Sequence, residues 1–331
     1  MPFSHILGQE TAVATLTRAL ETDRVHHAYR FEGPDGVGKE MAAFALAQAL
    51  VCVGGDKLGC GKCDACRRVV TFSEEEPHSP IHPDIRIVQR GFYPPEVLGQ
   101  RTGETKEISV HQIRAIVLSH AQFPPHEGRA RVFLVRAAEE MSTGAANALL
   151  KTLEEPRQGT HFVLLTARPD RLLSTIRSRT LPLRFGPLSE PILRGILTKH
   201  GVPAERQDLA IELSGGSASA ALALSDAEQS AARDAFVSAA LAAVRAPSLG
   251  PAVMLSESGD KDKDVLKMNL RALAAVLARE ARAKASEASA SAPRAASRYE
   301  VVQRAIAQID RNAAAGFVVT GMIAEMQRRV G

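Results

Sequence analysis

Residues 28–40 read AYRFEGPDGVGKE, a short strand-like run followed by a glycine loop. The alanine-rich residues 41–53 then favour a helix, so the order is strand, loop and helix. In that setting the pattern G-x-x-x-x-G-K-[ST] is a phosphate-binding loop. Its backbone N–H groups surround the phosphates, its lysine reaches the terminal ones, and its last hydroxyl binds magnesium. The residues of this chain that keep the loop are Gly33, Gly36, Gly38 and Lys39.

Glu40 replaces the magnesium-binding hydroxyl of this loop. A carboxylate cannot bind the metal in the same way, and at the start of the following helix it would repel the phosphates of a nucleotide. Lys39 is open to two interpretations, a retained phosphate ligand or an ordinary surface charge. We therefore predict an inherited loop that is unfit for hydrolysis and for which ATP binding is doubtful.

Strand signals alternate with helix signals over residues 1–187, and this alternation predicts an α/β domain with a parallel sheet and helices on both faces. Pro156 ends a strong helix signal over 142–155, and Gly186-Pro187 follows the last strand, so we place a domain boundary at 187. The further strand-like runs are 85–88, 132–135, 162–166 and 181–185.

Beyond residue 187 only helix signals remain. Helices are expected at 190–200 and 206–213, before a Gly215-Gly216 break. From about residue 226 onward the sequence is alanine-rich and is expected to be helical.

Two segments of the last domain have a distinct composition. Residues 284–297 are rich in alanine and serine, and we interpret them as a mobile connection between helices, although alanine also favours helix. Residues 299–329 space their apolar side chains helically and are expected to pack against the rest of the domain.

The composition is that of a globular protein. The 331 residues are 45% hydrophobic and carry a net charge of only +4, which does not by itself indicate nucleic-acid binding. The absence of Trp and the presence of only 3 Tyr disfavour a base-stacking surface for single strands. Because no stretch has the apolar run of a signal peptide or a membrane span, we expect a cytoplasmic protein without membrane contact.

All 4 cysteines fall within residues 52–66. Two successive C-x-x-C spacings and one upstream cysteine provide four thiolates for a tetrahedral ion, which predicts a zinc site. Disulfides are disfavoured in a reducing cytosol, and a redox C-x-x-C would not need four clustered thiols. With four protein ligands no position stays open for water, so the zinc is expected to be structural. The expected ligands are Cys52, Cys60, Cys63 and Cys66.

Several motifs of the first domain resemble those of the bacterial DNA polymerase III clamp loader, and most closely those of its delta-prime type. They include the glycine loop, the cysteine cluster after it, and the long run Asn147–Pro156, NALLKTLEEP. The shorter motifs are His27-Ala28-Tyr29, His82-Pro83-Asp84 and Thr175-Ile176-Arg177-Ser178-Arg179.

This resemblance implies a domain order and a set of partners. Residues 1–187 would be an AAA+ nucleotide-binding-like domain with a zinc module at 52–66, residues 188–225 a helical lid, and residues 226–331 a collar for oligomerisation. The partners would be gamma/tau and delta subunits in a hetero-pentameric ring, and through the ring the sliding clamp and primer–template DNA. The chain would thus be a component of a DNA-directed DNA polymerase holoenzyme.

The chain departs from the family members that hydrolyse ATP. These carry an acidic pair after the strand that corresponds to 132–135, where this chain has Arg136 and Ala137. The position of the lid's sensor arginine corresponds to Ser219. Together with Glu40 these are four departures, which we interpret as independent losses, and no intrinsic ATPase activity is expected. Glu139 and Glu140 lie past the strand end, and in an alternative interpretation one of them replaces the missing carboxylates.

Arg179 is the residue that the resemblance assigns to chemistry. Ser178-Arg179-Thr180 is similar to the family's Ser-Arg-Cys motif, whose arginine reaches the nucleotide of the neighbouring subunit. An arginine supplied in trans stabilises the charge on the transferred phosphoryl group.

The resemblance therefore favours a non-hydrolysing clamp-loader subunit that supplies an arginine finger. Two alternatives stay open. One is an ATP-hydrolysing motor subunit of the same ring, and the other is a zinc-dependent DNA-binding protein with a relict nucleotide fold.

Overall fold

A computed structural model describes residues 3–98, 107–127, 129–258, 263–286, 292–311 and 313–328. The chain divides into two compact units, Met1–Ile192 and Leu193–Gly331. Each unit is described by itself below.

The first unit is built on a five-stranded sheet with the strand order β2-β3-β4-β1-β5, in which every pair of neighbours is parallel. This confirms the parallel sheet expected from the alternating pattern. Strand β1 lies inside the sheet between β4 and β5, and Ala28, Tyr29, Arg30 and Phe31 are all buried, as expected for an interior strand of a sheet covered on both faces. The strands are β1 (Ala28–Glu32), β2 (Ile85–Val88), β3 (Arg131–Val135), β4 (Thr160–Thr166) and β5 (Leu181–Arg184).

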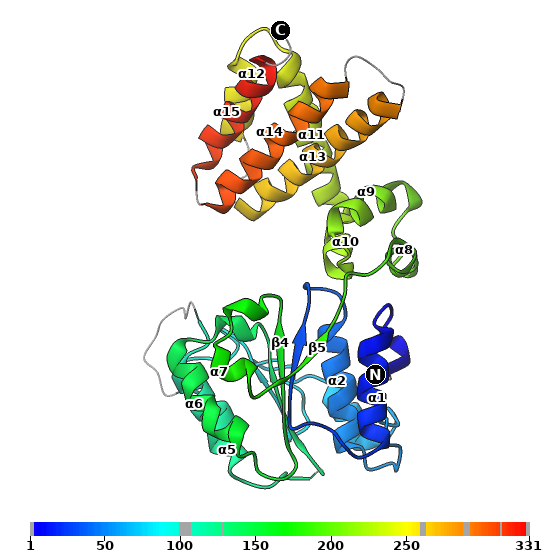
Figure 1. The fold of residues 1–331 in the computed structure, drawn as a ribbon, viewed down its shortest axis with the longest axis vertical. Coiled ribbons are helices and arrows are strands. Elements are labelled where there is room, and N and C mark those ends of the chain that lie inside the picture. Colours follow the sequence, from blue (N-terminus) through cyan, green and yellow to red (C-terminus); the bar gives the residue numbers. More distant parts are fainter. Residues whose placement is uncertain are drawn as a thin grey trace. The chain divides into compact units, whose positions relative to one another are not determined.

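Helices cover both faces of this sheet (Figure 1). On one side lie α1 (Glu10–Glu21) and α2 (Lys39–Val51), and on the other α5 (Ser119–Ala121), α6 (Thr143–Glu154) and α7 (Ser174–Arg177). The other helical segments of the unit are η1 (Phe3–His5), α3 (Asp64–Val70), α4 (Val110–Gln112), the π-helical η2 (Ile113–Leu118), η3 (Ala138–Glu140) and η4 (Pro169–Arg171).

Helix α6 shows how sequence sets one of these layers. The Ser142 hydroxyl caps its first turn by accepting a hydrogen bond of 3.2 Å from the N–H of Ala145. Leu149 and Leu153 are then buried in the same cluster as Phe133 and Phe162, whose rings stack with centroids 5.2 Å apart. The predicted helix therefore places its apolar side on β3 and β4.

Asp84, from the His82-Pro83-Asp84 motif, connects the start of the edge strand β2 to the segment before β3 and to β3 itself. Its side chain is fully buried and accepts hydrogen bonds from the backbone N–H groups of His126 (2.6 Å) and Glu127 (2.9 Å). It also forms an ion pair with the buried Arg131 at 3.0 Å. The motif is thus a structural element of the first unit.

We expect Asp84→Asn to destabilise the chain by about 3–5 kcal/mol, because it leaves the buried guanidinium of Arg131 without its counter-charge. Chemical denaturation of the purified chain measures this loss. The matched control is Asp23→Asn, since Asp23 is exposed, pairs with Lys57 and should change stability by less than about 1 kcal/mol. Equal midpoints for the two variants would contradict the structural role.

In the described residues of the second unit, all regular secondary structure is helical, as the loss of strand signals after residue 187 predicts. Helix α8 begins in the first unit and continues into the second. The helices are α8 (Glu190–Lys199), α9 (Ala204–Ser214), α10 (Ala218–Leu224), α11 (Ala227–Arg245), α12 (Gly250–Ser258), α13 (Lys263–Ser286), α14 (Ala292–Asp310) and α15 (Ala315–Arg328).

Two sequence predictions for this unit can be compared with the helices. Most of the alanine- and serine-rich stretch 284–297 belongs to the end of α13 and the start of α14, while residues 287–291 lie outside the described residues. The predicted segment 299–329 is divided between α14 and α15. Val302, Ile306 and Val318 are buried in the helical core, which confirms that the segment packs.

Among the described residues, none of the helices combines the length and the apolar character needed to cross a membrane.

Candidate functional site

The glycine loop lies between β1 and α2, as the sequence predicts. Gly33 has φ +150°, and a Cβ placed there would lie 2.2 Å from the carbonyl oxygen of Phe185, so only glycine fits. Gly38 has φ +100° and precedes the first turn of α2. The loop thus keeps the backbone that its sequence pattern requires.

Lys39 points back into its own loop. Its ammonium group donates hydrogen bonds to the carbonyl oxygens of Gly33 and Pro34, the latter at 2.6 Å, and lies 3.3 Å from the carboxylate of Asp35. The residue is buried, so it is not an ordinary surface lysine. Burial lowers the pKa of Lys39, and the nearby carboxylates of Asp35 and Glu139 offset part of this effect. All three ammonium hydrogens therefore have partners within the loop.

Glu40 and Arg136 form an ion pair at the position where a working site would hold its metal. Glu40 lies in the first turn of α2, Arg136 directly follows β3, and Nη2 of the arginine contacts Oε1 of the glutamate. Nη1 of Arg136 donates a 2.9 Å hydrogen bond to Gln89, and its guanidinium lies 5.9 Å from the ring centroid of Phe92. The charge of Glu40 is thus neutralised by a neighbour.

This pair corrects two expectations. Glu40 is not an isolated anion facing the loop, because Arg136 compensates it. The departures at Glu40 and Arg136 are also not independent losses, since each residue supplies the partner of the other. The sequence could not reveal this, because 96 positions separate the two residues.

The two glutamates proposed as replacement carboxylates already have partners. One oxygen of the buried Glu139 accepts a 3.1 Å hydrogen bond from the N–H of Ala167 and lies 4.0 Å from Arg168. Glu140 pairs with Arg90 at 3.3 Å. Ala137, in the second acidic position, offers no carboxylate. Ser219 belongs to the second unit, where its hydroxyl lies 3.2 Å from that of Ser217.

The structure brings the four predicted cysteine ligands together. Their sulfur atoms all lie within 4.8 Å of one another, with Cys52–Cys63 and Cys60–Cys66 separations of 4.0 Å. A tetrahedral zinc ion with Zn–S bonds of about 2.3 Å requires S–S distances of about 3.8 Å. The cluster therefore has the donor set and the size to hold such an ion.

Backbone N–H groups around the cluster favour thiolates. The N–H groups of Cys60, Cys63 and Cys66 donate to the sulfur atoms of Cys52, Cys60 and Cys63, at 3.4, 3.3 and 3.5 Å. Burial raises the pKa of Cys63, but these N–H groups and thiols outweigh burial and lower its pKa to about 6. Burial raises the pKa of the Cys66 thiol.

Two longer side chains connect the cluster to the rest of the first unit. The buried Gln48 of α2 donates a 2.7 Å hydrogen bond to the carbonyl oxygen of Cys66. Arg129 donates to the carbonyl oxygen of Cys52 at 2.9 Å. The cysteine cluster is therefore fixed to α2 and to the segment before β3.

Arg179 lies just after α7 and makes contacts with α6. Its Nε donates a 2.6 Å hydrogen bond to Oε1 of Glu154, and its Nη1 donates to the carbonyl oxygen of Thr175 at 3.0 Å. No sequence motif indicated this pair between Arg179 and Glu154. Thr180, at the motif's third position, is buried and accepts a 2.7 Å hydrogen bond from Arg30.

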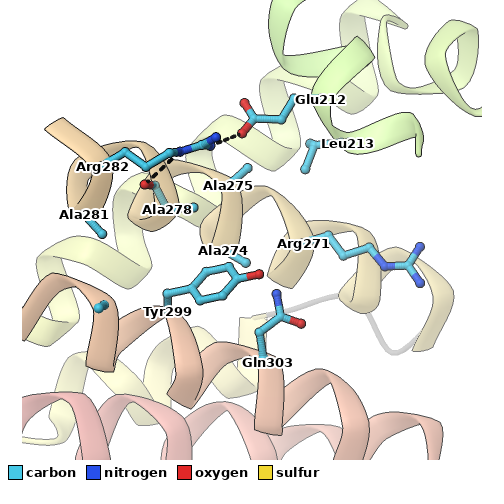
Figure 2. Close-up of a pocket in the computed structure, with 11 residues that line it drawn as sticks. Glu212, Leu213, Arg271, Ala274, Ala275, Ala278, Ala281, Arg282, Tyr299 and Gln303 are labelled. Carbon is cyan, nitrogen blue, oxygen red and sulfur yellow. Dashed lines mark hydrogen bonds and ion pairs between the residues drawn. The ribbon is translucent and has the colours of Figure 1, made fainter. Parts of the chain in front are cut away.

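A separate hollow lies in the second unit between α9, α13 and α14, with a volume of about 530 Å³. Figure 2 shows Tyr299 and Gln303 of α14 facing the alanines of α13, with Glu212 paired to Arg282 at the rim at 2.9 Å. None of the predicted site residues lines this hollow, and no sequence motif indicated it. Its lining residues are Glu212, Leu213, Arg271, Ala274, Ala275, Ala278, Ala281, Arg282, Ala296, Tyr299 and Gln303.

Comparison with curated proteins gives two kinds of relatives. The DNA polymerase III subunit delta' of Bacillus subtilis is 33% identical over 194 residues, which are 59% of this chain and 52% of that protein. The DNA polymerase III subunit gamma/tau of Mycobacterium tuberculosis is 33% identical over 198 residues, which are 60% of this chain and 31% of that protein. The chain thus spans about half, or less, of the length of these relatives.

Solved structures give more distant similarities. A DNA polymerase III gamma-subunit-related protein from Thermotoga maritima covers 96% of this chain and 98% of its own at 15% identity, with a TM-score of 0.49. The RuvB Holliday junction branch migration motor from the same organism covers 82% of each chain at 16% identity, with a TM-score of 0.41.

A family model shows which family the chain belongs to. The family model described as DNA polymerase III, delta subunit, matches residues 8–189, more than half of the chain. The matched range contains the glycine loop, the cysteine cluster and Arg179. The chain therefore belongs to the DNA polymerase III delta-subunit family, and the resemblance to clamp-loader AAA+ subunits is confirmed.

Proposed function

We propose that this protein is a non-hydrolysing clamp-loader subunit of the delta-prime type. The observation that carries the proposal is the Glu40–Arg136 ion pair. A hydrolysing site uses a hydroxyl and carboxylates to hold magnesium and to position water, whereas here one carboxylate is paired to a guanidinium. A cation at a metal-ligand position opposes metal binding, and the loss of a single electrostatic group costs about 10²–10³ in kcat.

The proposed contribution of the chain to the complex is positional. Its AAA+ body, residues 1–187, would stand in a hetero-pentameric ring with gamma/tau and delta subunits, and Arg179 would reach the nucleotide of an adjacent motor subunit. The lid (188–225) and collar (226–331) would join it to the ring. Through the ring it would act on the sliding clamp and primer–template DNA as part of the DNA polymerase holoenzyme.

We further propose that the four cysteines hold a structural zinc ion. The distances between the sulfur atoms and the N–H···S hydrogen bonds support this assignment. The ion would supply a fixed cross-link between residues 52 and 66, next to α2. We also propose that the protein is cytoplasmic, where the reducing environment would keep the four thiols from forming disulfides.

The steady-state rate of ATP hydrolysis by the purified chain tests the main proposal. We expect turnover at least about 100-fold below that of a gamma/tau subunit measured in parallel, from the cost of one missing electrostatic group. Nucleotide binding, measured with and without magnesium, should show no dependence on the metal. Turnover similar to that of the motor subunit would contradict the proposal.

The second candidate is an ATP-hydrolysing motor subunit of the gamma/tau type, which the equal identity to such relatives favours. In that case Glu139 would serve the metal, through the buried Oε2 that has no hydrogen-bond partner among the described residues. Metal-dependent nucleotide binding by the isolated chain would support this candidate.

The third candidate is a zinc-dependent DNA-binding protein. It predicts tight association of the isolated chain with DNA and a steep loss of affinity as salt rises. Weak binding at about 0.15 M salt would reject it.

A further inference from the structure

The guanidinium of Arg179 is almost fully occupied within its own chain. Nη1 donates to the carbonyl oxygen of Thr175 at 3.0 Å and to the hydroxyl of Ser178 at 3.2 Å. Nε donates to Oε1 of Glu154 at 2.6 Å, and Nη2 contacts the same oxygen. Because an arginine offers five N–H groups, only one on Nη2 is left.

In this arrangement the guanidinium of Arg179 is not available to bind the nucleotide of a neighbouring subunit. Recognition of a phosphate by arginine is strongest when two parallel N–H groups donate to it. The Nε and Nη2 edge that could do so faces Glu154, and the Nη1 side faces the chain's own backbone. A phosphate of the neighbouring subunit can therefore gain a bidentate contact on the Nε–Nη2 edge only by displacing the carboxylate of Glu154.

We infer that Glu154 is a positioning residue that holds Arg179 back and competes with the neighbour's nucleotide for its guanidinium. This inference rests on the trans role proposed above for Arg179. The pair is accessible, since the side chains of Arg179 and Glu154 are 32% and 46% exposed. Exposed ion pairs shift an equilibrium by about 1.5- to 5-fold, so a multiply charged phosphate can displace the carboxylate.

Glu155 provides a matched control. It adjoins Glu154 at the end of α6, is exposed, and its carboxylate makes no hydrogen bond or ion pair among the described residues. Glu155→Gln removes one carboxylate charge, as Glu154→Gln does, at the neighbouring position. Any effect of net charge or helix-end electrostatics should appear in both variants, whereas an effect through Arg179 should appear only in Glu154→Gln.

The experiment uses reconstituted rings of full-length subunits in which only the motor subunit beside this chain keeps its phosphate-loop lysine. ATP hydrolysis is measured over a range of ATP concentrations for Glu154→Gln, Glu155→Gln, Arg179→Ala and the double variant Glu154→Gln/Arg179→Ala. We expect Glu154→Gln to raise kcat/KM by about 1.5- to 5-fold, because the competing carboxylate is removed. Glu155→Gln should match the parent, and the double variant should match Arg179→Ala.

The outcomes separate this inference from the proposed function. If Arg179→Ala lowers kcat/KM but Glu154→Gln behaves like Glu155→Gln, the competition is rejected and the trans role stands. If Glu154→Gln lowers kcat/KM, the carboxylate aligns the guanidinium for the reaction, and the competition is again rejected. If Arg179→Ala has no effect, the trans role itself fails.

Discussion

Arg179→Ala is expected to lower ATP hydrolysis at the adjacent motor subunit by about 10³- to 10⁵-fold, the range found for arginines supplied in trans. The guanidinium would act on the charge that develops on the transferred phosphoryl group, so the loss should fall on kcat. The chain itself should fold normally, because the Arg179–Glu154 pair is partly exposed and contributes less than about 1 kcal/mol. Steady-state hydrolysis by a ring with a single competent motor site measures the effect.

Arg177→Ala is the control for this experiment. Arg177 lies two positions before Arg179, is exposed, and its side chain makes no hydrogen bond or ion pair among the described residues. It therefore tests whether any nearby positive charge is sufficient. Equal losses for both variants would point to a general electrostatic effect, and an unchanged rate for Arg179→Ala would discard the trans role.

Cys63→Ser is expected to abolish zinc binding and to destabilise the first unit. Cys63 is the N-cap of α3, where its side chain accepts the N–H of Cys66. Because serine is also a preferred N-cap residue, the variant retains the helix cap and removes only the thiolate. Structural zinc contributes about 10–16 kcal/mol in small zinc-finger peptides. The first unit also has a sheet core, so we expect a smaller loss here, of at least about 3 kcal/mol.

Metal content and thermal unfolding measure this effect. A loss of about 3 kcal/mol corresponds to a decrease in Tm of about 6–12 °C for a domain of this size. Treatment of the parent with a chelator should reproduce the decrease, and the variant should not respond to the chelator. A parent that contains no metal and melts at the same temperature as Cys63→Ser would show that the cluster has no structural ion.

Sequence predicted the parts of this molecule that depend on local patterns. The glycine loop has a fixed order of strand, loop and helix. The four cysteines lie within 15 positions, and their spacing was sufficient to predict that their sulfur atoms lie close together. The limits of α6 followed from Ser142 and Pro156. The division of residues 299–329 into α14 and α15 was missed, because apolar spacing continues through Ala313 across the break between them.

Contacts between distant residues could not be predicted in this way. The pairs Glu40–Arg136 and Glu154–Arg179 are 96 and 25 positions apart, and no sequence pattern joins charged residues of separate segments. Both pairs change the interpretation of a residue that the sequence analysis had singled out. Glu40 is a partner as well as a departure from the motif, and Arg179 is a restrained side chain.

The Glu40–Arg136 pair also bears on how this subunit responds to the energy state of the cell. A nucleotide site whose charges are balanced by bound magnesium and ATP changes its structure whenever the nucleotide is exchanged or cleaved. Here both charges belong to side chains of the protein, so the ion pair between Glu40 and Arg136 forms on folding and needs no ligand. The shape that the first unit offers to its neighbours should accordingly be the same at high and low ratios of ATP to ADP.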